Sequence, residues 1–218
     1  MNLAPGAVTS LLDSRALRPP DVPCVEVDRK APRALSQPQV RALQRETDRL
    51  RSSRDRAIVQ LLMLTGVRIG ELAALEVEDV RLTQRTGELV IRHGKGDRRR
   101  LVPLSRPARA ALREWLADRI AHRSQPSVKN GPLWISRTGE QMSVRSLGKI
   151  VSAVMDRAGI EDSAHALRHT VATRLVHDHR HDLVLVADIL GHADVKTTRH
   201  YARSGLEDRR AALEDLAN

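Results

Sequence analysis

The sequence predicts a mainly α-helical fold with a small antiparallel β-sheet, an α+β class. Apolar residues recur at helical spacing through most of the chain after residue 33. The period shortens only between residues 77 and 103, where brief apolar runs flanked by polar turns are typical of strands. Hydrophobic residues make up 41% of the 218, which is enough to build a core.

Residues 1–33 are expected to form a leader without its own core. Prolines interrupt this stretch at positions 19, 20, 23 and 32, and proline supplies no backbone N–H to a helix or sheet. The leader holds five basic and four acidic residues, so nearly all of the chain's net charge of +10 belongs to residues 34–218. We expect those residues to form one domain.

The first half of this domain predicts three helices. Ser36 is a suitable N-cap for the first of them. A second helix is expected at residues 54–65 and is ended by Gly66. A short third helix restarts near Arg68 and continues to residue 75.

The sheet is expected next. Residues 88–93 and 98–103 suit two strands, and the Gly-Lys-Gly-Asp sequence between them is typical of a hairpin turn. Residues 77–82 are a candidate third strand. A short extended run is expected at residues 133–135. Further helices are expected at residues 106–122, 143–158, 165–176, 183–190 and 206–216. Gly191 is expected to end the helix at residues 183–190.

Composition excludes several classes of protein. No run approaches the ~20 apolar residues of a membrane-spanning helix, and the N-terminus does not have the pattern of a secretory signal. The single Cys24 excludes an internal disulfide and supplies too few thiolates for a structural zinc site. These features favour a cytoplasmic protein without contact to a membrane.

The positive charge favours a nucleic-acid partner, because arginine donates paired hydrogen bonds to phosphate and only five of the 37 basic residues are lysine. A solvated basic surface without a partner is the alternative. The chain has no Phe and one Tyr, so recognition of single strands by stacking on a row of aromatic rings is excluded.

Four local motifs contain candidate catalytic residues. The first is Thr-Gly-Val-Arg-Ile-Gly-Glu-Leu at residues 65–72. Glu71 lies three residues after Arg68 on the same helix, so its carboxylate can orient the guanidinium. The alternative is an ordinary surface ion pair.

The second motif is the hairpin. Lys95 lies at its tip, where an ammonium can reach a bound ligand and act as a general acid; the alternative is a solvated turn lysine. Arg98, Arg99 and Arg100 follow and are candidate phosphate contacts. Neighbouring side chains of a strand point to opposite faces, so these three arginines cannot all contact one partner.

The third motif is His-Ala-Leu-Arg, in which His165 and Arg168 share a helix face. An imidazole beside a fixed cation suits a phosphate under attack, and the alternative is a basic helix start on the surface. The fourth motif is Leu-Gly-His followed nine residues later by the only tyrosine, and it contributes His192 and Tyr201. Polar residues surround Tyr201, which favours a functional role over a place in the core.

In this order and spacing, the four motifs resemble the catalytic domain of the tyrosine recombinase (phage integrase) family, over about residues 34–205. The resemblance implies a site-specific DNA recombinase or integrase of the kind found in mobile elements, with the fold of that catalytic domain. It implies Tyr201 as the nucleophile and Lys95 as the general acid. The remaining implied roles are phosphate binding by Arg68, Arg168 and His192, proton management by His165 and support by Glu71.

The chemistry of phosphodiester cleavage explains these residue types. Negative charge grows on the non-bridging oxygens in the transition state, and guanidinium and imidazole groups stabilise it. The tyrosine keeps the bond energy in a 3′-phosphotyrosine link, so the resemblance implies no metal and no cofactor. The run His-Asp-His-Arg-His-Asp at residues 177–182 resembles a metal site, but we expect a solvated loop there.

The resemblance also implies partners. Double-stranded DNA is the substrate, and members of the family act as four protomers on DNA, for which the C-terminal helix at residues 206–216 is the natural contact. Members normally carry an N-terminal DNA-binding domain, which residues 1–33 are too short to form. The alternatives are a nicking-closing activity of the topoisomerase IB type and a DNA-binding regulator without catalysis. A regulator has no need of a nucleophile.

Overall fold

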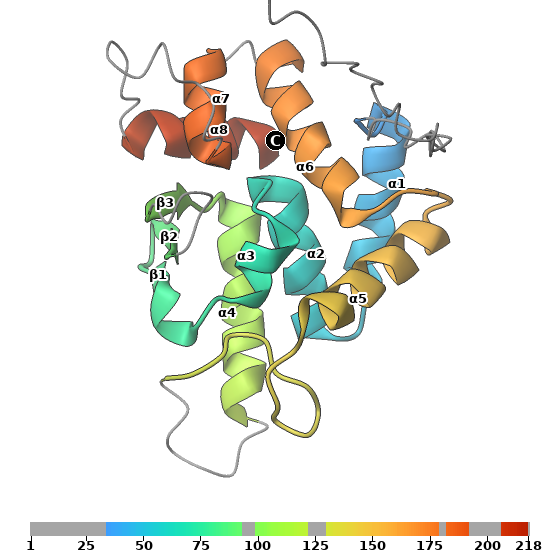
Figure 1. Ribbon diagram of the computed structural model, residues 1–218, viewed down its shortest axis with the longest axis vertical. Helices are drawn as coiled ribbons and strands as arrows, with labels where there is room; N and C mark the ends of the chain where they lie inside the picture. Colours follow the sequence, from blue (N-terminus) through green and yellow to red (C-terminus); the bar gives the residue numbers. More distant parts are fainter. Residues whose placement is uncertain (1–33, 93–98, 122–129, 179–181, 192–205, 218) are drawn as a thin grey trace, which may run out of the picture. The chain divides into compact units, whose positions relative to one another are not determined.

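Figure 1 shows the structure, a computed structural model that describes residues 34–92, 99–121, 130–178, 182–191 and 206–217. These residues belong to one unit, Ala31–Asn218. Within them, three α-helices precede a three-stranded antiparallel sheet, and five α-helices follow it. The α+β class expected from the sequence, mainly helical with a small sheet, is confirmed.

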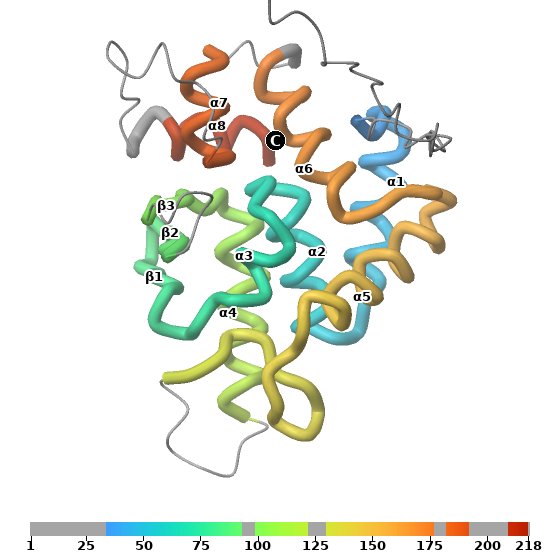
Figure 2. Tube along the Cα trace, in the orientation of Figure 1, coloured from blue at the N-terminus to red at the C-terminus, as the bar shows by residue number. Residues whose placement is uncertain are grey.

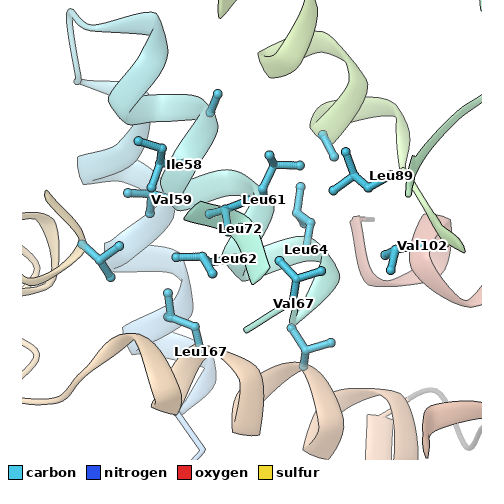
Figure 3. Close-up of a cluster of buried hydrophobic side chains, with 14 of the residues drawn as sticks. Ile58, Val59, Leu61, Leu62, Leu64, Val67, Leu72, Leu89, Val102 and Leu167 are labelled. Carbon is cyan, nitrogen blue, oxygen red and sulfur yellow. The ribbon is translucent and has the colours of Figure 1, made fainter. Parts of the chain in front are cut away.

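Helix α2 (Ser53–Thr65) is the centre of the core. Nine of its 13 residues are buried, and between Ala57 and Leu64 only Gln60 is polar. Figure 3 shows Ile58 and Leu61 of α2 among the buried side chains, with Leu89 of the sheet and Leu167 nearby. The helices packed around α2 are α1 (Gln37–Asp48), α4 (Arg106–Ala121), α5 (Val144–Arg157), α6 (Ala164–Thr173) and α8 (Leu206–Ala217).

Local signals explain where several helices begin and end. The hydroxyls of Ser52 and Ser143 accept hydrogen bonds from backbone N–H groups in the first turns of α2 and α5. Gly66 ends α2 and Gly191 ends α7 (Leu183–Leu190), both in the left-handed conformation that favours glycine. The two glycine stops expected from the sequence are therefore confirmed.

The sheet has the order β1 (Val80–Leu82), β2 (Gly87–Ile91) and β3 (Arg100–Pro103), with each neighbouring pair antiparallel. The expected strand at residues 77–82 begins three residues late, because Val77–Asp79 forms a 3₁₀ turn. The Asp79 carboxylate accepts a hydrogen bond from the backbone N–H of Glu76 and so favours the turn. The tip of the hairpin, residues 93–98, lies outside the described residues.

A second local difference follows α6. The helical backbone continues as a π-helical turn, Arg174–Asp178, in which Leu175 is fully buried. The sequence predicts a loop at residues 177–182, and this prediction is wrong for residues 177 and 178, which are helical. The packing of the buried Leu175 keeps the segment helical. Among the helices that the structure describes, none has the length and apolar character needed to cross a bilayer.

Helix α8 packs on its own chain. Ala212, Leu213 and Leu216 are buried in the common core. The Glu214 carboxylate accepts a hydrogen bond from Arg109 of α4 at 2.8 Å. Figure 2 shows α8, at the red end of the trace, beside α7 and the sheet, in agreement with its contacts to α7 and β3.

Candidate active site

The first part of the site forms where α2 ends. Gly66 adopts φ 62, and two residues later Arg68 is the N-cap of the short helix α3 (Ile69–Ala73). The Glu71 carboxylate accepts hydrogen bonds from the backbone N–H of Arg68 at 3.0 Å and from its Nη1 at 2.9 Å. The sequence motif therefore folds into a turn in which Glu71 holds both the backbone and the guanidinium of Arg68.

Gly66 is required at this turn for a second reason. A Cβ atom at this position would lie 2.7 Å from Cδ2 of Leu190 and 3.2 Å from Val171. No side chain fits at these distances without movement of its neighbours. The end of α2 therefore lies directly against α6 and the end of α7, which brings three distant parts of the sequence together.

Arg168 joins the same three elements. It extends from α6, is 5% exposed, and donates from Nη1 to the carbonyl of Gly66 at 2.7 Å and from Nη2 to the carbonyl of Leu190 at 2.8 Å. Both carbonyls lie at helix C-termini, where backbone acceptors lack helical partners and a cation is stabilised by the helix dipole. Arg168 thus fixes the ends of α2 and α7 to α6.

The environment of Arg168 lowers the pKa of its guanidinium but leaves the group protonated. Burial, followed by the positive charge of Arg68, lowers the pKa of the Arg168 guanidinium to about 10, although the negative charge of Glu71 partly opposes this. A pKa of about 10 leaves the group positively charged at neutral pH.

Glu71 binds a further arginine of the cluster. Arg100, on β3, donates from Nη1 and Nη2 to the two carboxylate oxygens of Glu71 at 3.0 and 2.7 Å. Burial acts to raise the pKa of the Glu71 carboxyl, but the hydrogen bonds and charge of Arg100 and the hydrogen bonds of Arg68 together lower it. Glu71 is therefore a buried carboxylate shared by two arginines.

The cluster reaches the turn that precedes His192. The carbonyl oxygen of Gly191 lies 3.4 Å from both Nη1 and Nη2 of Arg68. Gly191 has φ 66 and is the last described residue before the gap at residues 192–205. The last described residue before positions 192–205 therefore lies directly beside Arg68.

Three guanidiniums and one carboxylate give this cluster a net charge of +2. Of the side chains involved, that of Arg68 is 33% exposed, whereas those of Glu71 and Arg100 are 6% and 10% exposed. An anion that approaches from solvent can therefore contact Arg68 while the buried groups orient it. Such a preorganised positive site suits an oxyanion whose charge grows during reaction.

The structure thus brings together three of the site residues expected from sequence: Arg68, Glu71 and Arg168. The structure also places Arg100, which was expected to contact phosphate, in this cluster, where Glu71 engages both of its terminal nitrogens. The alternation of strand side chains was the signal available in the sequence, and the neighbouring Arg99 is exposed. Which of the hairpin arginines turns inward depends on contacts with α3, which no local pattern contains.

His165 is placed differently from Arg168. It is exposed near the start of α6, and its ring packs edge-to-face against that of His169 with a centroid distance of 5.3 Å. Residues three apart on a helix are offset by about 60°, so one can point inward while the other stays at the surface. The expected site residues Lys95, Arg98, His192 and Tyr201 lie outside the described residues.

Comparisons with known proteins agree with this arrangement. The model of the phage integrase family matches residues 33–207. The tyrosine recombinase XerC of Bifidobacterium longum (strain DJO10A) is 35% identical over 163 residues, which are 72% of this chain and 45% of that protein. The tyrosine recombinase XerD of Listeria monocytogenes serotype 4b (strain F2365) is 32% identical over 68% of this chain and 49% of its own length.

Solved structures show the same fold. The XerH site-specific recombinase in a pre-cleavage complex with its difH substrate matches with a TM-score of 0.64 and 28% identity, over 83% of this chain and 53% of that one. The XerA recombinase matches with the same TM-score and identity, over 86% and 63% of the two chains. This chain thus spans about half the length of the curated relatives above. With a family model that covers most of its length and an arginine cluster built from the expected motifs, the chain belongs to the phage integrase family, as a tyrosine recombinase catalytic domain.

Proposed function

We propose that this chain catalyses site-specific DNA recombination, in which it cleaves and rejoins double-stranded DNA through a 3′-phosphotyrosine intermediate on Tyr201. The observation that carries the proposal is the meeting of Arg68 and Arg168, 100 residues apart in sequence, around Glu71 at the turn before His192. The matching structure of the XerH recombinase has its DNA substrate bound, which supports DNA as the substrate proposed for this chain.

In this mechanism the cluster holds the scissile phosphate. Arg68 and Arg168 contact the non-bridging oxygens, and His192 adds a further donor. A guanidinium has five N–H donors, so Arg168 retains donors for the phosphate after its two bonds to backbone carbonyls. Because those two bonds fix Arg168 before DNA arrives, little reorganisation accompanies the growth of charge in the transition state.

The covalent step exchanges one ester for another. The phenolic oxygen of Tyr201 attacks phosphorus, its proton passes to a base, and the bond from phosphorus to the 5′ oxygen breaks. The departing 5′ oxygen takes a proton from Lys95 and leaves as a hydroxyl. His165 manages the proton of the nucleophile, and attack by a 5′ hydroxyl of another strand reverses the step and releases Tyr201. This chemistry requires no metal and no cofactor.

The proposed partners are DNA and further copies of the chain in the cytoplasm. Arg98 and Arg99 contact phosphates beside the cleavage site; Arg99 is exposed and so available for this. Four protomers assemble on DNA through α8. Because Ala212, Leu213 and Leu216 are buried in their own chain, this assembly requires α8 to exchange these contacts for equivalent ones on a neighbouring copy.

The same cleavage chemistry without strand exchange would be a topoisomerase-like activity, and DNA binding without cleavage would be regulation. The curated relatives and the solved structures reported above are recombinases, which favours strand exchange over both alternatives.

A pool of nicked duplexes with randomised sequence around the nick tests the proposal. Cleavage next to the nick releases a short fragment that diffuses away, so the covalent complex accumulates. We expect a protein–DNA adduct that survives denaturation with the wild-type chain and none with the Tyr201→Phe variant. Failure of the wild-type chain to form an adduct, or an adduct that persists in the variant, would contradict the proposed function.

A further inference from the structure

Arg100 forms a paired ion pair with Glu71 inside the arginine cluster. Its side chain is 10% exposed, and both terminal nitrogens bind the carboxylate of Glu71 in the paired geometry that arginine and carboxylate favour. The Glu71 carboxylate offsets part of the charge of Arg100, whereas the two bonds of Arg168 go to uncharged carbonyls and leave its charge for a phosphate. The placement of Arg100 points to a role inside the protein.

One oxygen of Glu71 serves both arginines. Oε1 accepts from Nη1 of Arg68 at 2.9 Å and from Nη1 of Arg100 at 3.0 Å. Without Arg100, the single negative charge of Glu71 would neutralise Arg68 alone. Because Arg100 shares that charge, the positive charge of Arg68 stays available to an incoming anion, while Glu71 still fixes the position of the Arg68 guanidinium.

Arg100 also lies against the turn before His192. A Cβ atom on Gly191 would be 2.8 Å from Cζ, 2.8 Å from Nη1 and 2.9 Å from Nε of Arg100. These nearly equal distances show that the planar guanidinium faces the Gly191 backbone. The same backbone carries the carbonyl that lies 3.4 Å from Arg68, so Arg100 contacts both the carboxylate and the turn that frame Arg68.

We propose that Arg100 is a positioning residue for DNA cleavage: it holds Glu71 and the Gly191 turn so that the charge and orientation of Arg68 suit the scissile phosphate. This inference rests on the proposed function. It assigns Arg100 to the interior of the site, and it leaves the phosphate contacts of the hairpin to exposed arginines such as Arg99.

Two measurements separate positioning from DNA contact. The first is the single-turnover rate of adduct formation at saturating nicked duplex. The second is the slope of log K against log salt for a generic duplex, which falls by about 1 when a phosphate contact is lost. We expect Arg100→Gln to lower the rate about tenfold or more and to leave the slope unchanged, whereas Arg99→Gln lowers the slope by about 1.

Two further variants control the interpretation. Arg100→Lys keeps the positive charge but cannot make the paired bonds, so we expect it to recover only part of the rate. Arg81→Gln removes an arginine of the same sheet that pairs with Glu88 away from the cluster, and both its rate and its slope should match the wild type. Thermal melting of each variant tests whether it is folded. If Arg100→Gln does not fold, the rate and salt slope of Arg100→Lys test the role of Arg100.

The two proposals fail separately. Absence of a Tyr201-dependent adduct with the wild-type chain would remove the proposed function and this inference with it. A wild-type adduct combined with a normal rate for folded Arg100→Gln, full recovery by Arg100→Lys, or a reduced salt slope for Arg100→Gln would overturn the role of Arg100 alone.

Discussion

At the scale of single residues, Arg168 shows how one side chain serves both fold and site. Its bonds to the carbonyls of Gly66 and Leu190 satisfy two helix ends, and its charge lies beside Arg68 and Glu71. A buried cation near a like charge is unfavourable by itself. The two carbonyls and the shared carboxylate offset that cost, which keeps Arg168 charged where a phosphate would bind.

The pH dependence of an Arg168→Lys variant tests this placement. An ammonium has an ordinary pKa of about 10.4, and the surroundings that lower the pKa of Arg168 would lower that of the ammonium toward neutral pH. The variant then loses its positive charge as pH rises, whereas the wild type keeps it. We expect the ratio of variant to wild-type cleavage rates at saturating DNA to fall about fivefold or more between pH 7 and pH 9.

Arg49→Lys is the matched control, because the Arg49 side chain is 72% exposed and does not belong to the cluster. Its rate ratio should not change over the same range. A flat ratio for Arg168→Lys would show that position 168 does not carry a charge needed for cleavage.

At the scale of elements, the site depends on two helix ends and on one arginine that joins them. Gly66 ends α2, Gly191 ends α7, and Arg168 of α6 bonds to both ends. The nine buried residues of α2 fix the position of its end at Gly66. The core therefore sets the geometry of the arginines, and substitutions in the core should affect the site through it.

Helix α8 gives a test at this scale. Leu213 is fully buried against the chain's own core, so Leu213→Ala should leave a cavity and lower the free energy of unfolding by about 2–5 kcal/mol. Urea denaturation followed by circular dichroism measures this loss. Ala211→Gln, at an exposed position of the same helix, should change stability by about 0.5 kcal/mol or less. Equal stability of the two variants would mean that α8 does not pack on its own chain in solution.

Sequence patterns predicted the elements better than their junctions. Ser36 marks a helix start because serine is a favoured N-cap, and Gly66 marks a helix end because glycine adopts the left-handed conformation. Periodicity and capping rules were therefore enough to predict these two helix ends. The 3₁₀ turn Val77–Asp79 and the π-helical turn Arg174–Asp178 depend on a carboxylate cap and a buried leucine, which alternation and helical period do not reveal.

The candidate site was predictable to a similar degree. The pair of Arg68 and Glu71 is local, and the sequence gives its spacing directly. The bond between Glu71 of α3 and Arg100 of β3 joins residues 29 apart. No spacing rule contains that contact, so the sequence predicts Arg98, Arg99 and Arg100 alike as candidate phosphate contacts.

At the scale of the whole molecule, charge links the site to the proposed DNA substrate. The chain has a net charge of +10, and the cluster of Arg68, Glu71, Arg100 and Arg168 has +2 at its centre. The wider field favours association with a polyanion, whereas the buried cluster favours the additional negative charge of the transition state. Loss of the wider positive field should lower the affinity for DNA, whereas loss of charge in the cluster should lower the cleavage rate.

The most direct test of the account compares these two consequences in Arg68→Ala. Single-turnover adduct formation at saturating nicked duplex measures the rate, and titration of the same duplex measures affinity. We expect the rate to fall by ~10²–10³, equivalent to roughly 3–4 kcal/mol of lost transition-state stabilisation, while Kd changes only a few-fold. A normal rate once DNA is bound, with the whole effect in Kd, would contradict the claim that this cluster stabilises the reacting phosphate.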